Sequence, residues 1–432
     1  MQPFAELGAL VESRWRDENY NERVFPGIAA LALSELKLSD RVDPWEIIHW
    51  VHSTPHLPQQ MNLEGKFGDP PITLYAGPRF YIDVYYWLDG TTSIHQHAFS
   101  GAFQVLLGSS VHADYRFEQE QEINPRFLVG RILLKGVSLL AKGDVREINP
   151  GPQFIHSLFH LDRPSATITI RTYHSPEAPV QYSYMKPFLA RDPFFIDPFL
   201  TKKVETVELL LRMKHPEADK FIGELIDASD FQTTYSVLKT TFAFLCHREL
   251  EELLGLARSR DRFDALLDRA RAKHGAPAEL LLPVFEEEWL QNDISRRRAE
   301  IKGEDHRFFL ALLLNVPNRR EVLRLIKERF PDKNAPELII DWVRELLATR
   351  TFGSRESNVL GLENFDETHL LVLKGLLEGL TPAEIKTRAL AGLASTAGGE
   401  VSITDIANHL QSISLFKSLF AESDKPTLAK VG

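Results

Sequence analysis

The period of the hydrophobic pattern changes twice along this chain of 432 residues, and those changes limit what it can fold into. Up to about residue 55, and again after Thr201, apolar side chains recur every three or four residues, as in amphipathic helices. Between about Pro70 and Tyr173, short runs rich in Tyr, Phe, Val, Ile and Thr are separated by turn sequences, which is typical of a sandwich or barrel. We therefore predict a multidomain α and β chain, with N-terminal helices and a β-barrel followed by an all-α C-terminal domain.

A proline-rich stretch lies between the strand pattern and the second helical pattern. Residues 176–200 contain five prolines, so neither a regular helix nor a central strand is expected there. We predict a packed linker whose end divides the chain into domains 1–200 and 201–432. An apolar patch of this size rarely faces water, so four phenylalanines of the linker are expected to be buried between the two halves: Phe188, Phe194, Phe195 and Phe199.

Charge and composition exclude several classes of function. The chain has 50 basic and 60 acidic residues, a net charge of −10, so nucleic acid is not an expected partner. No apolar stretch is long enough for a membrane-spanning helix, so no membrane partner is expected. The single cysteine, Cys246, and an N-terminus that carries acidic residues predict a cytoplasmic protein. A protein partner or self-association, if there is one, is expected to use the helical half.

Two histidines of the strand region have the spacing of metal ligands. His95 and His97 are separated by one residue in a strand pattern, so their rings project from the same face. His156 follows the turn NPGPQ and leads into a later strand, from which it can supply a third ring. Three neutral imidazoles on one side of a metal leave the opposite positions open for substrate and dioxygen. We predict a metal site formed by these histidines; the alternative is that they are hydrogen-bonded core residues.

The surrounding pattern resembles the first motif of the cupin family. In that motif a glycine precedes an H-x-H pair and a second glycine closes the segment, as Gly90, His95, His97 and Gly108 do here, with the first spacing one residue shorter. The glutamate that usually supplies a fourth ligand is absent, because Gly101 stands at its position. The resemblance implies a cupin β-barrel.

Within that family, the likeness is greater to the cysteine dioxygenase branch, whose members hold Fe(II) with three histidines and no carboxylate. The segments SIHQH, EINPGPQFIH and TYHSP occur here in the order and spacing of that branch, over roughly residues 43–176. Tyr173 follows His156 at the separation of the branch's catalytic tyrosine. The resemblance therefore implies one Fe(II) per chain, held by His95, His97 and His156, with Tyr173 as a catalytic residue.

This chain departs from the branch at several of its functional positions. Gly101 and Ala102 stand where mammalian-type members have a cysteine that crosslinks to the tyrosine, so no such crosslink is expected. Thr169 and Arg171 occupy the positions of a serine and a histidine that orient the tyrosine. Arg171 would favour an anionic substrate or lower the pKa of the phenol. The remaining expectations are that Arg79 or Gln60 helps Arg171 to bind substrate and that Thr169 and His160 support the metal ligands.

These observations leave three functions open. The first is a non-haem Fe(II)-dependent dioxygenase that adds dioxygen to a small thiol or related anionic molecule. The second is a cupin sensor or scaffold without catalysis, whose helical half binds a partner. The third keeps the metal but oxidises a small molecule that is not a thiol. Retention of three histidines together with Tyr173 favours catalysis, because ligand binding alone would not require both.

Overall fold

The computed structural model describes residues 1–61, 63, 67–246, 258–350, 358–392 and 402–422. Its first part is helical, as predicted. Helix α4 begins at Pro44, and the side chain of Asp43 accepts a hydrogen bond from the backbone N–H of Trp45, a favourable helix start. The helical elements here are α1 (Gln2–Asp17), η1 (Glu22–Val24), α2 (Phe25–Leu36), α3 (Leu38–Arg41) and α4 (Pro44–Ser53).

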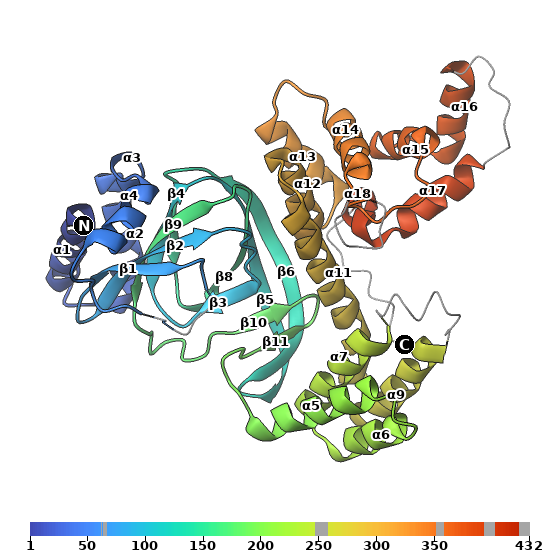
Figure 1. Cartoon of the computed structure of the whole chain (residues 1–432), viewed down its shortest axis with the longest axis horizontal. Helices are drawn as coiled ribbons and strands as arrows, with labels where there is room; N and C mark the ends of the chain where they lie inside the picture. The colour runs from blue at the N-terminus through green and yellow to red at the C-terminus, as the bar shows by residue number, and fades with distance from the viewer. Residues whose placement is uncertain (62, 64–66, 247–257, 351–357, 393–401, 423–432) are drawn as a thin grey trace.

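An antiparallel sheet of five strands follows these helices in Figure 1. In spatial order its strands are β1 (Pro71–Ala76), β2 (Phe80–Trp87), β9 (Ser165–Thr172), β4 (Gly101–Leu107) and β7 (Val145–Ile148). Because side chains alternate along a strand, Ile168 and Ile170 of β9 pack with Phe4 and Leu7 of α1 in one apolar cluster. The N-terminal helices therefore cover one face of this sheet, and Thr169 projects from the other.

Six further strands close into a barrel. Side chains from every one of them meet in a small apolar cluster that includes Ile94, Ile155 and Tyr184. His95 and His156 project from the opposite faces of their strands, toward the five-stranded sheet, since the ring of Phe103 on β4 lies 6.1 Å from that of His156. The strands are β10 (Ser183–Met185), β11 (Leu189–Arg191), β6 (Phe127–Leu140), β5 (Ser110–Asn124), β8 (Gly151–His160) and β3 (Ile94–His97).

The rest of the chain is helical and packs against the barrel in two apolar cores. One core includes Phe127 and Leu189 of the barrel, and the other includes Val111 and Phe159. Figure 1 shows α11 and α12 running beside the barrel. The elements are α5 (Pro198–Arg212), α6 (Ala218–Ala228), α7 (Phe231–Leu245), α9 (Arg258–His274), α10 (Ala276–Glu279), α11 (Leu281–Glu300), α12 (Glu304–Asn315), α13 (Arg319–Arg329), α14 (Ala335–Ala348), α15 (Glu367–Leu377), α16 (Pro382–Gly392), α17 (Ile403–Ser412), η2 (Ser414–Phe416) and α18 (Lys417–Phe420).

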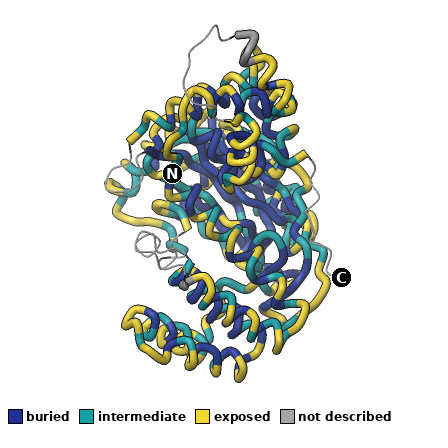
Figure 2. Tube along the Cα trace, turned by 90° about the vertical axis from the view of Figure 1, so that its right-hand side faces the viewer, coloured by how far each residue is buried: buried dark blue, intermediate teal, exposed yellow. Residues whose placement is uncertain are grey.

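The predicted fold class is confirmed: N-terminal helices and a β-barrel and sheet region precede a C-terminal helical region. Figure 2 shows buried residues concentrated in the interior of the molecule, with exposed residues on the outer faces of the helices. None of the helices in the described part of the chain has the length and apolar character needed to cross a bilayer. The division into domains 1–200 and 201–432 stays a prediction.

The interpretation of residues 176–200 as a linker without strands was wrong. Strands β10 and β11 lie within it and complete the barrel, because β10 pairs with β3 and β11 pairs with β6. Their prolines fall outside the paired segments, which removes the conflict with strand hydrogen bonding.

The predicted burial of the linker phenylalanines holds for Phe188 alone. Phe194 is 70% exposed, Phe195 43% and Phe199 81%. The physical reason is the course of the chain: β11 ends at Arg191, so the three later rings follow the last paired residue and lie outside the barrel. The ring of Phe195 instead lies under the guanidinium of Arg126, 3.4 Å from its centroid.

Candidate metal centre and cavity

The three histidines of the predicted metal site converge in the structure. The register of β3 and β8 places His95 directly opposite His156, and a bulge follows before His97. Each histidine offers one ligand nitrogen, and the three nitrogens lie within 4.8 Å of one another. Nε2 of His97 and Nε2 of His156 are 2.9 Å apart. These atoms are close enough to share one metal ion, which binds imidazole nitrogen at about 2 Å.

Burial keeps all three rings neutral, which is the form that binds a metal. Desolvation by burial is the main reason why the pKa of His95 is lowered. It lowers the pKa of His97 and of His156 well below the usual value, and the neighbouring histidines add to the effect. A neutral nitrogen donor set of this kind fits a divalent transition metal.

In two of the three histidines, the ring nitrogen that would not bind the metal has a hydrogen-bond partner. The Nδ1–H of His95 donates to the carbonyl of Ser93 at 2.8 Å, so its Nε2 is left for a metal. Nδ1 of His156 lies 3.0 Å from Nε2 of His112, a fully buried residue on β5. With Nε2 of His156 as the ligand atom, its Nδ1–H donates to His112. Such contacts fix the tautomer and the orientation of a ligand ring.

His112 and its neighbour Asp114 were missed in the sequence. Burial lowers the pKa of His112 to about 3, so this ring is neutral too. Its Nδ1 is 3.6 Å from a carboxylate oxygen of Asp114, longer than a hydrogen bond. The signal was present, because His112 and Asp114 are separated by one residue in a strand pattern and share a face. What the sequence did not show is that β5 pairs with β8 beside His156.

Gly101 stands at the position of the missing fourth ligand, and the structure gives a steric reason for its small size. A Cβ atom added there would lie 2.0 Å from the carbonyl oxygen of Ile170 on the adjacent strand. No side chain fits at that distance without movement of the backbone. A carboxylate ligand is therefore excluded at this position in the present arrangement of β4 and β9.

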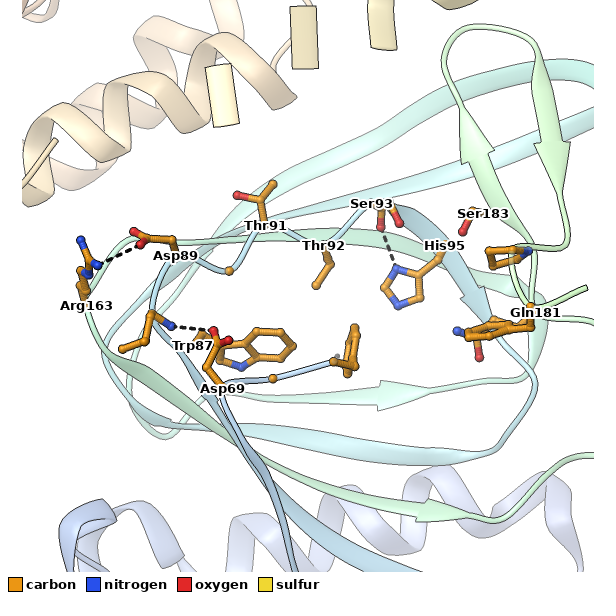
Figure 3. Close-up of a pocket in the computed structure, with 16 residues that line it drawn as sticks. Asp69, Trp87, Asp89, Thr91, Thr92, Ser93, His95, Arg163, Gln181 and Ser183 are labelled. Carbon is orange, nitrogen blue, oxygen red and sulfur yellow. Dashed lines mark hydrogen bonds and ion pairs between the residues drawn. The ribbon is translucent and has the colours of Figure 1, made fainter. Parts of the chain in front are cut away.

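A cavity of about 710 Å³ opens onto His95. Figure 3 shows His95 and Trp87 pointing into it. Its polar groups include Asp89 and Arg163, which form an ion pair at 3.2 Å. Phe67 and Phe194, both exposed, add aromatic surface. The cavity gives a small molecule access to one predicted metal ligand, along a wall that combines the rings of Trp87, Phe67 and Phe194 with polar and charged side chains.

His160 and Thr169 are both buried and are not part of the three-histidine group. The ring of His160 stacks on Trp87 with centroids 4.8 Å apart, and its Nδ1 is 3.1 Å from the hydroxyl of Ser110. Burial first, and then Arg298, lower its pKa to about 3. Thr169 is buried on the interior face of β9. A supporting role for either residue stays a prediction.

The burial of His160 predicts an acid-sensitive fold. An unfolded histidine has a pKa near 6.5, so below that pH the unfolded state binds the extra proton and stability falls as pH decreases. Between pH 7 and pH 5 we expect His160 to remove about 2 kcal/mol of stability. Urea unfolding of the metal-free protein at both pH values measures this. The His160→Gln variant should show a smaller difference, and an equal difference would contradict the prediction.

Arg171 is close to the metal ligands but not in the cavity wall. Its guanidinium lies over the ring of Phe99, 3.4 Å from the centroid, and Phe99 in turn contacts the ring of His97 at 4.6 Å. Its positive charge is one cause of the lowered pKa of His97. The residues that line the 710 Å³ cavity do not include it. Its expected role in substrate binding stays a prediction.

The other two residues expected to bind substrate have partners elsewhere. Gln60 binds β1, since its side chain donates to the carbonyl of Thr73 at 2.9 Å and accepts from the Thr73 N–H at 3.0 Å. Arg79 is exposed, with its guanidinium over Tyr20, 4.2 Å from the ring centroid. Neither residue is among those that line the 710 Å³ cavity, and their expected role in substrate binding stays a prediction.

Tyr173 follows the last residue of β9 and is 37% exposed. Its hydroxyl donates to the carbonyl of Gly77 at 2.7 Å, and its ring packs on Tyr81 with centroids 5.1 Å apart. The catalytic role of Tyr173 stays a prediction.

We expect Tyr173→Phe to leave metal affinity unchanged and to cost at most about 1 kcal/mol of stability, because one hydrogen bond at a partly exposed site is lost. Metal titration and urea unfolding measure both. A fall in turnover at unchanged metal affinity and stability would support the predicted catalytic role, and unchanged turnover would contradict it.

Comparisons with known proteins give little beyond this geometry. No protein-family model matches the sequence, and no curated protein matches it. Hydroquinone 1,2-dioxygenase from Sphingomonas sp. TTNP3, solved with 4-hydroxybenzoate bound, is similar over 25% of this chain and 68% of its own, with 13% identity and a TM-score of 0.19. A DMSP lyase structure is similar over 26% of this chain and 51% of its own (14% identity, TM-score 0.18). A capsular polysaccharide assembling protein of Staphylococcus aureus is similar over 27% of this chain and 32% of its own, with 16% identity and a TM-score of 0.17. TM-scores this low say nothing about activity.

Proposed function

We propose that this chain is a cytoplasmic non-haem Fe(II)-dependent dioxygenase that acts on a small molecule bound in the 710 Å³ cavity. One observation carries the proposal: three buried, neutral histidines converge where that cavity ends at His95. An iron(II) ion held by His95, His97 and His156 would supply the redox chemistry that dioxygen requires. The donor set leaves room for exogenous ligands, because only three protein nitrogens take part.

The chain's own residues would bind and orient the substrate. Trp87 and Phe67 present aromatic faces to the cavity, and their rings meet edge to face with centroids 5.0 Å apart. Arg163 supplies a positive charge for an anionic group, in competition with Asp89. Burial of the histidine cluster between the sheets excludes bulk water from the face opposite the cavity.

Two substrate classes follow. The resemblance to the cysteine dioxygenase branch implies a small thiol or related anionic molecule, which would gain both oxygen atoms of O₂ to give a sulfinate. The rings of Phe67, Trp87 and Phe194, which form part of the cavity wall, would pack against an aromatic molecule that is not a thiol, and its oxidation is the second class. The two are distinguished by which class stimulates oxygen consumption.

The test begins with the protein reconstituted with Fe(II) under anaerobic conditions. Metal content should approach one ion per chain, and oxygen consumption should rise with a member of a panel of small thiols or phenols. With ¹⁸O₂, both labelled atoms should appear in the product. The His95→Ala variant is the matched control and should lose metal and activity together. A protein that binds iron but consumes no oxygen with either panel would contradict dioxygenase activity.

The second candidate function is a ligand sensor or scaffold without catalysis. The observation that favours it is the apolar surface at the start of the helical region, where Ile196 is 74% exposed beside Phe199. A partner that covers this surface would fit such a role. Metal-dependent ligand binding without turnover, measured by calorimetry, would support this function over the first.

A further inference from the structure

The loop between β2 and β3 connects the cavity wall to a metal ligand. Residues 88–93 line the cavity, and the carbonyl of Ser93 accepts the hydrogen bond from Nδ1 of His95. Thr92 is bound to β8 in both directions: its N–H donates to the carbonyl of Leu158 at 2.8 Å, and its hydroxyl accepts from the Leu158 N–H at 2.7 Å. The position of this loop therefore affects both the shape of the cavity and the orientation of His95.

We propose that helices α11 and α12 belong to the metal site, because two buried arginines on them, Arg298 and Arg307, hold this loop in place. The inference rests on the metal site of the proposed function and assigns a role to the helical half of the chain. Both arginines act through the loop, so they are positioning residues.

Arg298, near the end of α11, is 1% exposed. One terminal nitrogen donates to the carbonyl of Gly90 at 2.5 Å and to the hydroxyl of Thr91 at 2.7 Å. The other donates to the carbonyl of His160, and the guanidinium lies 4.3 Å from the ring centroid of Phe159. The planar guanidinium of Arg298, with its several N–H donors, thus joins the loop 88–93, called the cavity loop below, to the end of β8.

Arg307, on α12, is buried beside it. Its guanidinium donates to the carbonyls of Ile301 at 2.8 Å and Leu161 at 3.3 Å. It also lies 3.4 Å from the carboxylate of Asp89, the second residue of the loop 88–93. Asp89 therefore lies between Arg307 of the helical region and Arg163 of the cavity wall.

The loop has little freedom to take another position while these contacts exist. A Cβ atom on Gly90 would lie 2.7 Å from the Trp87 ring and 3.1 Å from the ring of His160, so the backbone passes close to both. Burial lowers the pKa of Arg298 only to about 10, so it remains a cation at neutral pH. A buried cation that loses its acceptors is strongly destabilised, so helix and loop hold each other in place.

The experiment compares two buried arginines on the same helix, using Co²⁺ as the probe metal. Arg297 is the matched control, because its guanidinium binds Asp293 at 2.7 Å and the carbonyl of Val359, both within the helical region. Arg298→Met and Arg297→Met should both lower stability. We expect Arg298→Met alone to weaken Co²⁺ binding by roughly tenfold or more and to change the Co²⁺ absorption spectrum. Arg298→Lys, which keeps a cation, should recover part of the affinity.

Thr91→Val is the second variant, for the case in which Arg298→Met does not fold. It removes one acceptor of Arg298 with little change in volume, and it should weaken Co²⁺ binding and increase amide hydrogen exchange in residues 88–93. Unchanged affinity and exchange in Thr91→Val, or equal losses in the two arginine variants, would overturn the inference while leaving the metal site intact. A wild-type protein that binds no Co²⁺ would overturn the proposed metal site as well.

Discussion

His97→Ala should abolish metal binding, with affinity reduced by at least about 100-fold, because the site falls from three nitrogen donors to two. We choose His97 for this test because its Nε2 is only 2.9 Å from Nε2 of His156, a second predicted metal ligand. A metal at a hundredfold excess over its Kd should stabilise the wild-type protein by about 2.7 kcal/mol and should not stabilise the variant. Equilibrium dialysis and urea unfolding with and without metal measure both effects.

The control is His174→Ala, which removes an exposed histidine two residues after the end of β9 in the five-stranded sheet. It should bind metal as the wild-type protein does. Circular dichroism should show that the helical content of His97→Ala is unchanged, since the ring packs on Phe99 and Phe154, which lie outside the helices. Retention of stoichiometric metal by His97→Ala would refute the three-histidine site.

His112→Leu should weaken metal binding by roughly 10- to 100-fold, because it removes the acceptor that orients His156. Leucine fills much of the buried volume but cannot accept the hydrogen bond from Nδ1. His112→Gln places an amide oxygen near the former Nε2, so it should recover most of the affinity. Competition with a chelator of known affinity gives the dissociation constants.

Asp114→Asn serves as the control for this pair. Asp114 is 3.6 Å from His112, so loss of its charge should change metal affinity by much less than loss of the His112 ring. If His112→Leu and His112→Gln weaken metal binding equally, the effect comes from packing and the hydrogen-bond role is rejected. Unfolding in the absence of metal shows how much packing alone contributes.

Much of the architecture could be predicted because it depends on local patterns. The three-to-four residue period after Thr201 indicates helices in any context, and the short β-branched runs before Tyr173 indicate strands. The failure lies in residues 176–200, where prolines masked two strands of three residues each. Such short strands depend on pairing with β3 and β6, and that pairing is not encoded in their own sequence.

The sequence by itself determined that His95 and His97 share a strand face, since the period of two is a property of the extended backbone. Only the tertiary structure decided which residues from other strands lie beside these two histidines. Antiparallel pairing of β3 with β8 brings His156 opposite His95, and pairing of β8 with β5 brings His112 behind it. The same holds for Arg298, which reaches the cavity loop across 207 positions of sequence. Long-range contacts of this kind follow from how sheets and helices pack, and no spacing rule along the chain records them.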